Sequence, residues 1–486
     1  MSNWKEFFKG KRVTLMGLGL LGRGAGDAVF LAEHGAELIV TDIRDAEILA
    51  SSLAKLKKYK NIQYVLGEHR LEDFRNRDFI LKAAGIPLDS PFIAEAEKNR
   101  IPIEMDASLF AKLMPEGVTL VGVTGTRGKS TTTALIFDIL SLAKSYKLKA
   151  ISSVYRGGNL VPEATLPLLE EVRAGDIVVL ELDSWQLQGF HDARISPQVA
   201  VFTTFLDDHL TYYKGDTDRY FEDKVAIFKY QKKGDILIIG EQVVRTLRKG
   251  LTFVTKDSPL RKPFVACVAD IPADWRIPLP GEHNLENIAC ALAVAKHFGI
   301  PDAAVQKAVE NFKAIPGRLE FLREVNGVKI YNDNNSTTPD ATIAGLRALN
   351  PKSEIRNPKQ SPNPQSLNAK RSTLNAGAKR IVLIMGGTDK GLDMSKLVTE
   401  IPRHCKAVIL LRETGTEKLK RIMNYELGIT IEEREMLKEC VDEAMKIAQK
   451  GDIVLFSPAF ASFGKWFKNE YDRGEQFVTL IDKLIP

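Results

Sequence analysis

The segment Gly122–Thr133 reads GVTGTRGKSTTT and has the residue types that hold a nucleoside triphosphate. A β-branched apolar run leads into its glycines, and an apolar run with helical spacing follows them. Backbone N–H groups in such a turn bind phosphates at a helix N-terminus, while a lysine contacts the terminal phosphates and a serine hydroxyl binds Mg²⁺. The candidate ATP-binding residues are Gly125, Thr126, Arg127, Gly128, Lys129, Ser130 and Thr131. The alternative is a plain glycine turn, since Val123 stands where the usual phosphate loop has its first glycine.

Acidic residues follow two later runs of the strand type. Glu181 closes DIVVLEL, and Asp207, Asp208 and His209 follow VAVFTTF. Ligands of parallel α/β sheets bind at the carboxyl ends of the strands, and oxygen ligands suit the Mg²⁺ that accompanies ATP. These residues are therefore candidate metal ligands, although each one by itself also fits a solvated loop.

A second glycine-rich turn lies near the N-terminus. Gly17, Gly19 and Gly22 have the spacing G-x-G-x-x-G between a strand-like run and a helical pattern. Asp42 ends the next strand-like run, ELIVTD. Such glycines bring a helix N-terminus close to a phosphate or ribose, and a carboxylate can accept hydrogen bonds from hydroxyl or ring N–H groups. By itself the pattern indicates either a dinucleotide site or a merely tight strand-to-helix turn.

Three further polar segments have the chemistry of ligand contacts. Asn284 and Asn287 fall on the first turn of a predicted helix, where their amides can read an adenine edge or cap the helix. The segment Tyr331–Thr342 is a long polar stretch after a strand-like run. The segment Ser457–Gly474 begins with small polar residues, which suit a loop that cups a small zwitterion.

Composition excludes several classes of protein. The 486 residues include 68 basic and 62 acidic side chains, mixed along the chain, so the net charge of +6 gives no indication of nucleic-acid binding. The four cysteines are widely spaced, which argues against a disulfide framework and a zinc site. The sequence has neither a signal-peptide core nor a long apolar run, so we expect a cytoplasmic protein with no membrane partner.

The elements that must position these residues alternate between short apolar runs and longer helical patterns. The strand-like runs are RVTLMGLG, AELIVTD, VTLVGVTG, DIVVLEL, VAVFTTF, DILIIG, RIVLIMGG, KAVILL and DIVLFSP. This alternation predicts an α/β fold with parallel sheets flanked by helices. Length and a Pro-Gly pair in FKAIPGRLEF favour three domains, 1–115, 116–317 and 318–486. Within the third, the Pro-, Asn-, Ser- and Lys-rich segment 351–379 is predicted to be an exposed loop insertion.

In their order along the chain, these motifs resemble the Mur ligase family, which adds amino acids to cell-wall precursors. The matching blocks are GVTGTRGKSTTT, LELDSWQLQ, FLDDHLTYY, GEHNLENIACALA, GRLEF, YNDNNSTTPDAT and LFSPAFASFGKWFKNEYDRG. The resemblance implies a Rossmann-like N-terminal domain for a UDP-sugar, a central P-loop ATPase-type parallel-sheet domain, and a Rossmann-like C-terminal domain for the amino acid. Most similar are the members that join D-glutamate to UDP-N-acetylmuramoyl-L-alanine through an acyl phosphate.

The resemblance also implies roles for single residues, in a monomeric enzyme that uses ATP and two Mg²⁺ ions. The catalytic residues would be Lys129, His209 and Lys224. The ATP site would add Asn284, Asn287, Arg318 and Asp333 to the phosphate loop. The UDP-sugar would contact Gly17, Gly19, Gly22, Asp42, Arg44 and Asn159, and D-glutamate would contact Thr337, Lys390 and Ser462. Ser130, Glu181, His209 and Lys224 would hold the metal ions, with Lys224 carbamylated so that it offers an anionic oxygen.

Some positions depart from the family pattern, and other functions remain open. Arg127 replaces the usual asparagine, Asn335 replaces a frequent lysine, and Gly317 replaces a frequent histidine. Alternatives within the class are a ligase for L-alanine or a diamino acid and a folylpolyglutamate-type ligase. An NAD-dependent dehydrogenase would use the N-terminal glycines but leaves the phosphate loop unexplained. A catalytically inactive nucleotide sensor would not need Lys129 and Lys224.

Overall fold

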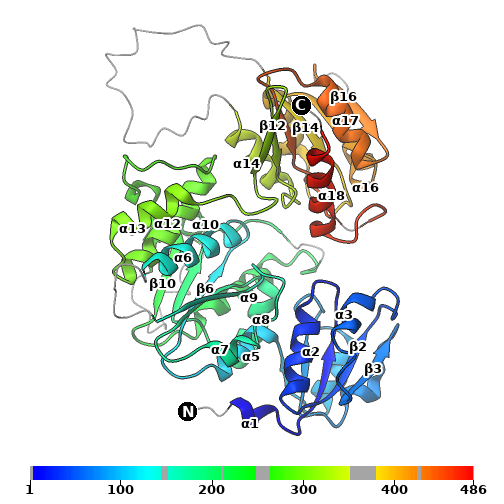
Figure 1. The fold of residues 1–486 in the computed structure, drawn as a ribbon, viewed down its shortest axis with the longest axis vertical. Helices are drawn as coiled ribbons and strands as arrows, with labels where there is room; N and C mark the ends of the chain where they lie inside the picture. The colour runs from blue at the N-terminus through cyan, green and yellow to red at the C-terminus, as the bar shows by residue number, and fades with distance from the viewer. Residues whose placement is uncertain are drawn as a thin grey trace. The chain divides into compact units, whose positions relative to one another are not determined.

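The computed structural model describes residues 4–143, 152–208, 212–247, 263–350, 379–423, 428–462 and 464–484. These residues form an α/β protein with three sheets, each accompanied by helices (Figure 1). The chain divides into two compact units. The first unit comprises Met1–Asp207, Asp216–Cys267 and Glu286–Ala308, and the second comprises Asp208–Gly215, Val268–Leu285 and Val309–Pro486. The predicted α/β fold class is confirmed, whereas the bounds of the three predicted domains remain predictions.

The N-terminal sheet is fully parallel and has the strand order β3-β2-β1-β4-β5. Its strands are β1 (Arg12–Met16), β2 (Glu37–Asp42), β3 (Ile62–Leu66), β4 (Phe79–Lys82) and β5 (Ile103–Glu104). The helices here are α1 (Trp4–Phe8), α2 (Arg23–Glu33), α3 (Ala50–Ala54), the 3₁₀ turn η1 (Leu71–Phe74), α4 (Pro91–Lys98) and α5 (Asp106–Leu113). The chain leaves β1 toward one edge and later crosses to β4 on the other side. Ligands of open α/β sheets bind at such a reversal of strand order.

The second sheet is also fully parallel, in the order β11-β10-β9-β6-β8-β7. Its strands are β6 (Thr119–Thr124), β7 (Val154–Gly158), β8 (Ile177–Glu181), β9 (Val199–Phe202), β10 (Ile236–Gly240) and β11 (Phe264–Ala266). The helices along this part of the chain are α6 (Lys129–Ala143), α7 (Leu168–Glu171), α8 (Ser184–Ala193), α9 (Thr217–Lys229), α10 (Glu241–Leu247), the 3₁₀ turn η3 (Val268–Asp270), α12 (Glu282–His297) and α13 (Asp302–Asn311). Because β8 and β9 flank β6, the segments that follow these three strands meet at one edge of the sheet.

The C-terminal sheet is mixed, with the order β12-β13-β17-β14-β15-β16. Its strands are β12 (Glu320–Val325), β13 (Val328–Asn332), β14 (Ile381–Met385), β15 (Cys405–Leu411), β16 (Thr430–Arg434) and β17 (Ile453–Phe456). Its helices are α14 (Pro339–Ala348), α15 (Ser395–His404), α16 (Thr414–Ile422), α17 (Leu437–Ile447) and α18 (Glu470–Asp482). Only β12 runs antiparallel, because Asn326 and Gly327 form a two-residue turn with φ angles of 52° and 77°. Asn-Gly is the preferred pair for such a hairpin turn.

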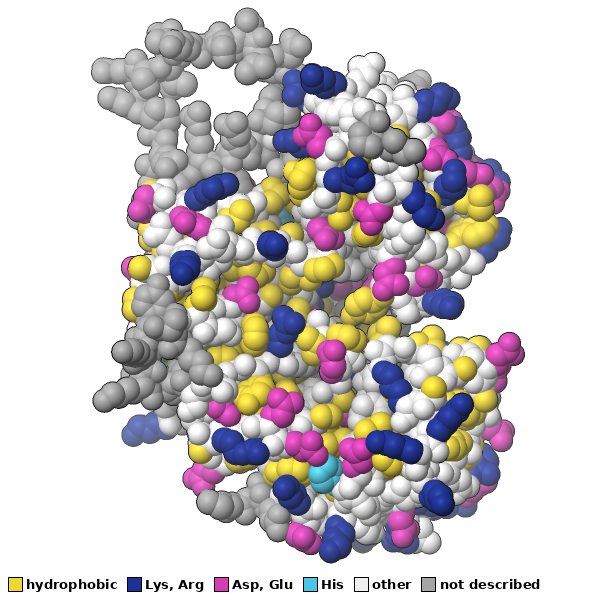
Figure 2. All heavy atoms as spheres, in the orientation of Figure 1, with side chains coloured by type: hydrophobic (Ala, Val, Ile, Leu, Met, Phe, Trp, Pro, Cys, Tyr) yellow, Lys and Arg dark blue, Asp and Glu magenta, His cyan; other side chains and the backbone are white. Residues whose placement is uncertain are grey.

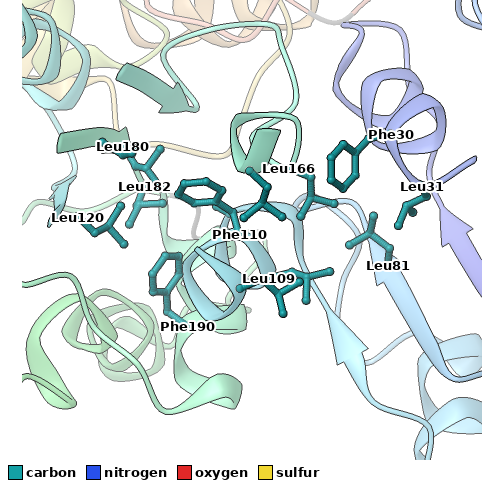
Figure 3. Close-up of a cluster of buried hydrophobic side chains, with 14 of the residues drawn as sticks. Phe30, Leu31, Leu81, Leu109, Phe110, Leu120, Leu166, Leu180, Leu182 and Phe190 are labelled. Atoms are coloured by element: carbon teal, nitrogen blue, oxygen red, sulfur yellow. The ribbon is translucent and has the colours of Figure 1, made fainter. Parts of the chain in front are cut away.

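One buried apolar cluster runs through both sheets of the first unit. Figure 3 shows Phe30 and Leu81 from the N-terminal sheet region, Leu109 and Phe110 from α5, and Leu180 from the second sheet. Helix α5 also packs against α7 and α8. The N-terminal sheet and the second sheet therefore share a continuous core.

The nine predicted strand-like runs are all strands, namely β1, β2, β6, β8, β9, β10, β14, β15 and β17. In α6 the predicted apolar face is confirmed, because Leu135, Ile136, Ile139 and Leu140 are buried. Apart from Lys379, the predicted loop insertion 351–379 lies outside the described residues.

On the face shown in Figure 2, basic and acidic side chains are interspersed, without a continuous basic patch among the described residues. Within the described ranges no helix combines the length and the apolar character needed to cross a membrane. All four cysteines carry free thiols, and three of them are buried: Cys290, Cys405 and Cys440.

Candidate active site

The predicted phosphate loop connects β6 to α6, with Lys129 as the first residue of the helix. Gly125 and Gly128 have φ angles of 151° and 84°, a backbone region that favours glycine. A side chain at Gly125 would overlap the hydroxyl of Thr203. The loop therefore needs glycine at these two positions, for its own backbone and for the close approach of the segment after β9.

Thr203 and Thr204, which follow β9, hold the loop through several hydrogen bonds. The N–H of Thr126 donates to the carbonyl of Thr204 at 2.7 Å, and the N–H of Arg127 donates to the Thr204 hydroxyl at 2.8 Å. The hydroxyl of Thr203 in turn donates to the carbonyl of Arg127 at 2.5 Å. Sequence reasoning missed both threonines, although they stand only a few residues before the predicted acidic cluster. Their role is to fix the backbone of the loop.

Two of the predicted catalytic lysines meet at this loop. The ammonium of Lys129 donates to the carbonyl oxygens of Gly125 and Thr126 at 2.9 and 3.3 Å. The ammonium of Lys224, on α9, donates to the same Gly125 oxygen at 3.0 Å, although Lys224 is buried. The fold thus places two amines, from helices far apart in sequence, beside the turn that would bind phosphates.

The amide of Asn287, on α12, also lies against the phosphate loop. The hydroxyl of Thr132 donates to its oxygen at 3.4 Å, and a side chain at Gly128 would overlap the same oxygen. Asn284 lies in the second unit, where its amide donates to the carbonyl of Pro280 at 2.7 Å. This bond ties the first turn of α12 to the segment before it, but it is not a helix cap, because the Asn284 amide donates rather than accepts.

Glu181 ends β8 and is almost completely buried, with 1% of its surface exposed. Its Oε2 atom has no hydrogen-bond partner among the described residues. A buried carboxylate oxygen without a partner is costly, and a cation would compensate it. Ser130, at the start of α6, is buried at the same edge of the sheet. The chemistry of these two side chains fits a magnesium site.

The remaining predicted metal ligands are placed only in part. Lys224 lies at the phosphate loop, whereas His209 falls outside the described residues. Across the described ranges, no three His, Cys, Asp or Glu side chains gather into a metal-binding cluster. The predicted set combines Glu181 with a serine, a lysine and His209, so it does not depend on such a cluster.

In the N-terminal sheet, Asp42 organises the predicted UDP-sugar residues. Its carboxylate is buried and accepts hydrogen bonds from the N–H of Gly19 at 3.0 Å and the N–H of Arg44 at 2.9 Å. The guanidinium of Arg44 donates to the same carboxylate at 3.3 Å. Gly17 has a φ of 93° and packs so closely on Ala83 that no side chain would fit. Gly22, with a φ of 102°, directly precedes α2 as its N-cap residue.

Asn159 follows β7 and is bound by Arg23, which sequence reasoning missed. The guanidinium of Arg23 donates to the Asn159 side-chain oxygen at 2.7 Å and to its carbonyl at 3.1 Å. The N–H of Asn159 donates to the carbonyl of Glu181 at 2.8 Å. Arg23 thus ties α2 of the N-terminal sheet to a residue beside the candidate metal ligand. Its only sequence signal is its place directly after Gly22.

Sequence reasoning also missed Lys82, the last residue of β4. Its ammonium is buried and donates to the carbonyl oxygens of Ala83, Ala84 and Ile86 at 3.3, 3.3 and 2.7 Å. Burial lowers the pKa of Lys82 to about 8, against the opposing attraction of three aspartates. The lysine fixes the loop 83–86, which packs on Gly17.

In the second unit, Asp333 follows β13 and is the centre of a buried polar cluster. It accepts hydrogen bonds from the N–H of Leu319 at 2.9 Å and from the hydroxyls of Ser336 and Ser457 at 2.6 and 2.9 Å. Burial raises the pKa of Asp333 to about 6, and these hydrogen bonds oppose the rise. Arg318, the neighbouring predicted ATP residue, is exposed.

Two of the predicted amino-acid contacts lie together. The ammonium of Lys390 donates to the hydroxyl of Thr337 at 3.0 Å. Ser462 is buried and follows directly after Ala461, which pairs with Thr388 in an isolated β-bridge. Asn335, at the position of the frequent family lysine, donates to the carbonyl of Pro316 at 3.3 Å. These residues all come from the segments that follow β13, β14 and β17.

A phosphate loop between β6 and α6, with two lysines at it and, among the described residues, a buried carboxylate oxygen without a hydrogen-bond partner at the same sheet edge, is typical of proteins that bind a nucleotide and its metal. Comparison with protein families gives three matches. The Mur ligase MurD-like N-terminal domain matches residues 11–104, the Mur ligase middle domain matches 123–295, and the Mur ligase glutamate ligase domain matches 361–460. The chain belongs to the Mur ligase family.

Curated relatives match over nearly the full length. A UDP-N-acetylmuramoylalanine--D-glutamate ligase of Roseiflexus sp. (strain RS-1) is 34% identical, with 98% of this chain and 99% of the relative covered. A protein of the same name from Borreliella burgdorferi (strain ZS7) is 31% identical, with 98% of both chains covered.

Solved structures share the fold. The UDP-N-acetylmuramate-alanine ligase MurC of Thermotoga maritima aligns with a TM-score of 0.60 and 19% identity, over 97% of this chain and 99% of that one. The MurF ligase of Thermotoga maritima, in complex with ADP, aligns with a TM-score of 0.53 and 18% identity, over 99% and 96% of the two chains.

Proposed function

We propose that this protein is an ATP-dependent ligase that joins D-glutamate to UDP-N-acetylmuramoyl-L-alanine in the synthesis of peptidoglycan precursors. The observation that carries the proposal is the meeting of Lys129 and Lys224 at the Gly125 carbonyl, in a phosphate loop that lies at one sheet edge with Glu181. The curated relatives named above, which span the whole chain, support the choice of D-glutamate. We place the reaction in the cytoplasm and expect a monomer.

In the first step, a carboxylate oxygen of the UDP-sugar attacks the γ-phosphorus of ATP and ADP leaves, which gives an acyl phosphate. The loop N–H groups, Arg127 and Lys129 bind the phosphates and offset the negative charge that develops on the transferred group. Asn287 lies against the same loop and would contact the nucleotide. Magnesium, when bound, would supply further charge neutralisation; Ser130, Glu181, His209 and carbamylated Lys224 would hold it.

In the second step, the amine of D-glutamate attacks the acyl carbon and phosphate leaves. A carboxylate is a poor electrophile, and the phosphate supplies the leaving group that a free carboxylate lacks. Thr337, Lys390 and Ser462 would bind the carboxylates of D-glutamate, while the Gly17 and Asp42 region would bind the UDP portion of the other substrate. Much of the rate enhancement would come from holding both substrates in line.

The test is a phosphate-release assay with purified protein, ATP, Mg²⁺, UDP-N-acetylmuramoyl-L-alanine and a panel of amino acids. We expect release only when the UDP-sugar and D-glutamate are both present. Release with another amino acid in place of D-glutamate would contradict the substrate but keep the ligase activity. NADH oxidation without ATP turnover would contradict the ligase activity itself.

A further inference from the structure

Arg473, on α18, is a fully buried cation with 0% of its surface exposed. Within the described residues it makes no salt bridge, and its three hydrogen bonds go to neutral oxygens. Nε donates to the Asn334 side-chain oxygen at 2.6 Å, Nη2 donates to the Asn334 carbonyl at 2.8 Å, and Nη1 donates to the Phe460 carbonyl at 3.2 Å. Burying an arginine without a salt bridge is costly; the carboxylate of Glu470 offsets part of this cost at longer range, and the three hydrogen bonds compensate part of the lost hydration.

The partners of Arg473 stand beside the predicted amino-acid contacts. Asn334 precedes Thr337 in the segment after β13, and its own amide donates to the carbonyl of Glu470 at 2.7 Å. Phe460 precedes Ser462 in the segment after β17. The arginine therefore connects two loops that each carry one of these contacts.

The third loop, after β14, passes close to the same guanidinium. A side chain at Gly387 would lie 3.3 Å from Nη1 of Arg473. Thr388 exchanges two backbone hydrogen bonds with Ala461, at 3.0 and 3.1 Å, and Lys390 lies two residues further along. All three loops that carry Thr337, Lys390 and Ser462 thus converge on Arg473.

The loops also have backbone conformations that need support. Ala459 has a φ of 63°, and Gly386 and Gly387 have φ angles of 135° and 145°. A non-glycine residue such as Ala459 stays at a positive φ only where the surrounding structure fixes it from several sides. The N–H of Ala459 donates to the carbonyl of Ser336 at 2.8 Å, and Arg473 binds the carbonyl of the next residue, Phe460.

We infer that Arg473 is a positioning residue for the amino-acid substrate, which locks the loops after β13, β14 and β17 into one preformed site. This inference rests on the proposed function of Thr337, Lys390 and Ser462. A guanidinium is suited to the task because its planar fork presents five N–H donors in fixed directions, whereas an ammonium is a single point of charge. Arg473 itself touches no substrate.

The test compares full-length Arg473→Lys and Arg473→Met with the wild type in the phosphate-release assay. We expect the KM for D-glutamate to rise about tenfold or more, while the KM values for ATP and the UDP-sugar stay within about twofold. The matched control is Ile481→Ala, a buried residue further along α18, which loosens the same helix without touching the three loops. Its KM for D-glutamate should stay at the wild-type value. Arg473→Lys keeps the charge and serves as the test if Arg473→Met does not fold.

Amide hydrogen exchange gives a second readout. In Arg473→Lys we expect faster exchange in segments 333–338 and 457–462, and in Ile481→Ala we expect no change there. A D-glutamate KM that stays at the wild-type value, or three KM values that rise together in Arg473→Lys and Ile481→Ala alike, would overturn the inference. A wild-type enzyme with no D-glutamate turnover would instead contradict the proposed function, so the two failures are distinguishable.

Discussion

Lys129 and Lys224 donate hydrogen bonds to one and the same carbonyl oxygen, that of Gly125, at 2.9 and 3.0 Å. Two ammonium groups that share an acceptor repel each other, and the burial of Lys224 weakens the screening by water. Carbamylation of Lys224 would replace one of the two positive charges by a negative one. The geometry therefore gives a physical reason for the modification that the family resemblance implies.

Replacement of Lys224 should remove most of the activity. We expect Lys224→Ala to lose phosphate release about a hundredfold or more, because it removes a proposed metal ligand and its charge from the proposed site of phosphoryl transfer. Added formate or acetate should restore part of the activity, since a short carboxylate can occupy the vacated space. Lys229→Ala, an exposed lysine on the same helix, is the control and should keep wild-type turnover. Wild-type activity in Lys224→Ala would remove this residue from the site.

A side chain at Gly128 should weaken nucleotide binding. In Gly128→Ala the new methyl group would overlap the Asn287 oxygen, and the backbone φ of 84° would be strained. We expect the Kd for ATP, measured by titration calorimetry, to rise about tenfold to a hundredfold. The control is Gly299→Ala. Gly299 has a φ of 67° and open space around it, so this variant has the backbone strain without the steric overlap. Equal ATP affinity in both variants would argue against a role for the Gly128 contact.

Lys82 should make the stability of the protein depend on pH in the alkaline range. Its pKa is about 8 in the folded protein against 10.5 in the unfolded chain, so the folded state binds fewer protons between these values. The free energy of unfolding should therefore rise with pH across this window, by up to about 3 kcal/mol relative to Lys82→Met. Denaturant unfolding of both proteins between pH 7.5 and about 10 measures this difference. Parallel pH profiles would show that Lys82 stays charged.

Asp333 should make the free energy of unfolding fall with rising pH in the acidic range, opposite to the effect of Lys82 in the alkaline range. Its pKa is about 6 in the folded protein against 3.8 as the reference value, so the folded state holds its proton longer than the unfolded chain does. Stability should therefore fall as the pH rises from about 4 to about 6, by up to about 3 kcal/mol relative to Asp333→Asn. The two proteins are compared by urea unfolding at several pH values in that range. A constant difference across the range would contradict the pKa shift.

The nine strands that the sequence predicts are largely buried on both faces, although the equally buried β4, of only four residues, was not predicted. β8 and β14, for example, are buried along their whole length, and their runs of Ile, Val and Leu reflect it. β3 and β16 were missed because they lie at sheet edges and are largely half-buried or exposed, so their composition is mixed. β12 was missed for the same reason, although the Asn-Gly turn after it is a hairpin signal.

The site residues that lie on local sequence motifs could be predicted. The residues that hold them in place could not. The glycines and Lys129 share one turn, so their spacing indicates their chemistry directly. The supporting residues act through their hydrogen bonds to other residues. Three of them bind partners that are distant in sequence: Thr203 binds Arg127, Arg23 binds Asn159, and Arg473 binds Asn334. No local spacing indicates such contacts. Lys82 acts on its own loop, but its burial depends on the packing of the whole sheet.

The hydrogen bonds from Thr203 and Thr204 have a consequence for the thermodynamics of nucleotide binding. They fix the backbone of the loop through hydrogen bonds within the protein, so ATP would meet a preorganised cradle and would lose little binding free energy to ordering it. Removing one of these hydroxyls would raise the conformational entropy of the unbound loop. ATP binding would then have to order the loop at a cost in free energy. Part of the affinity for ATP would then depend on two threonines whose hydroxyls bind the backbone of the loop.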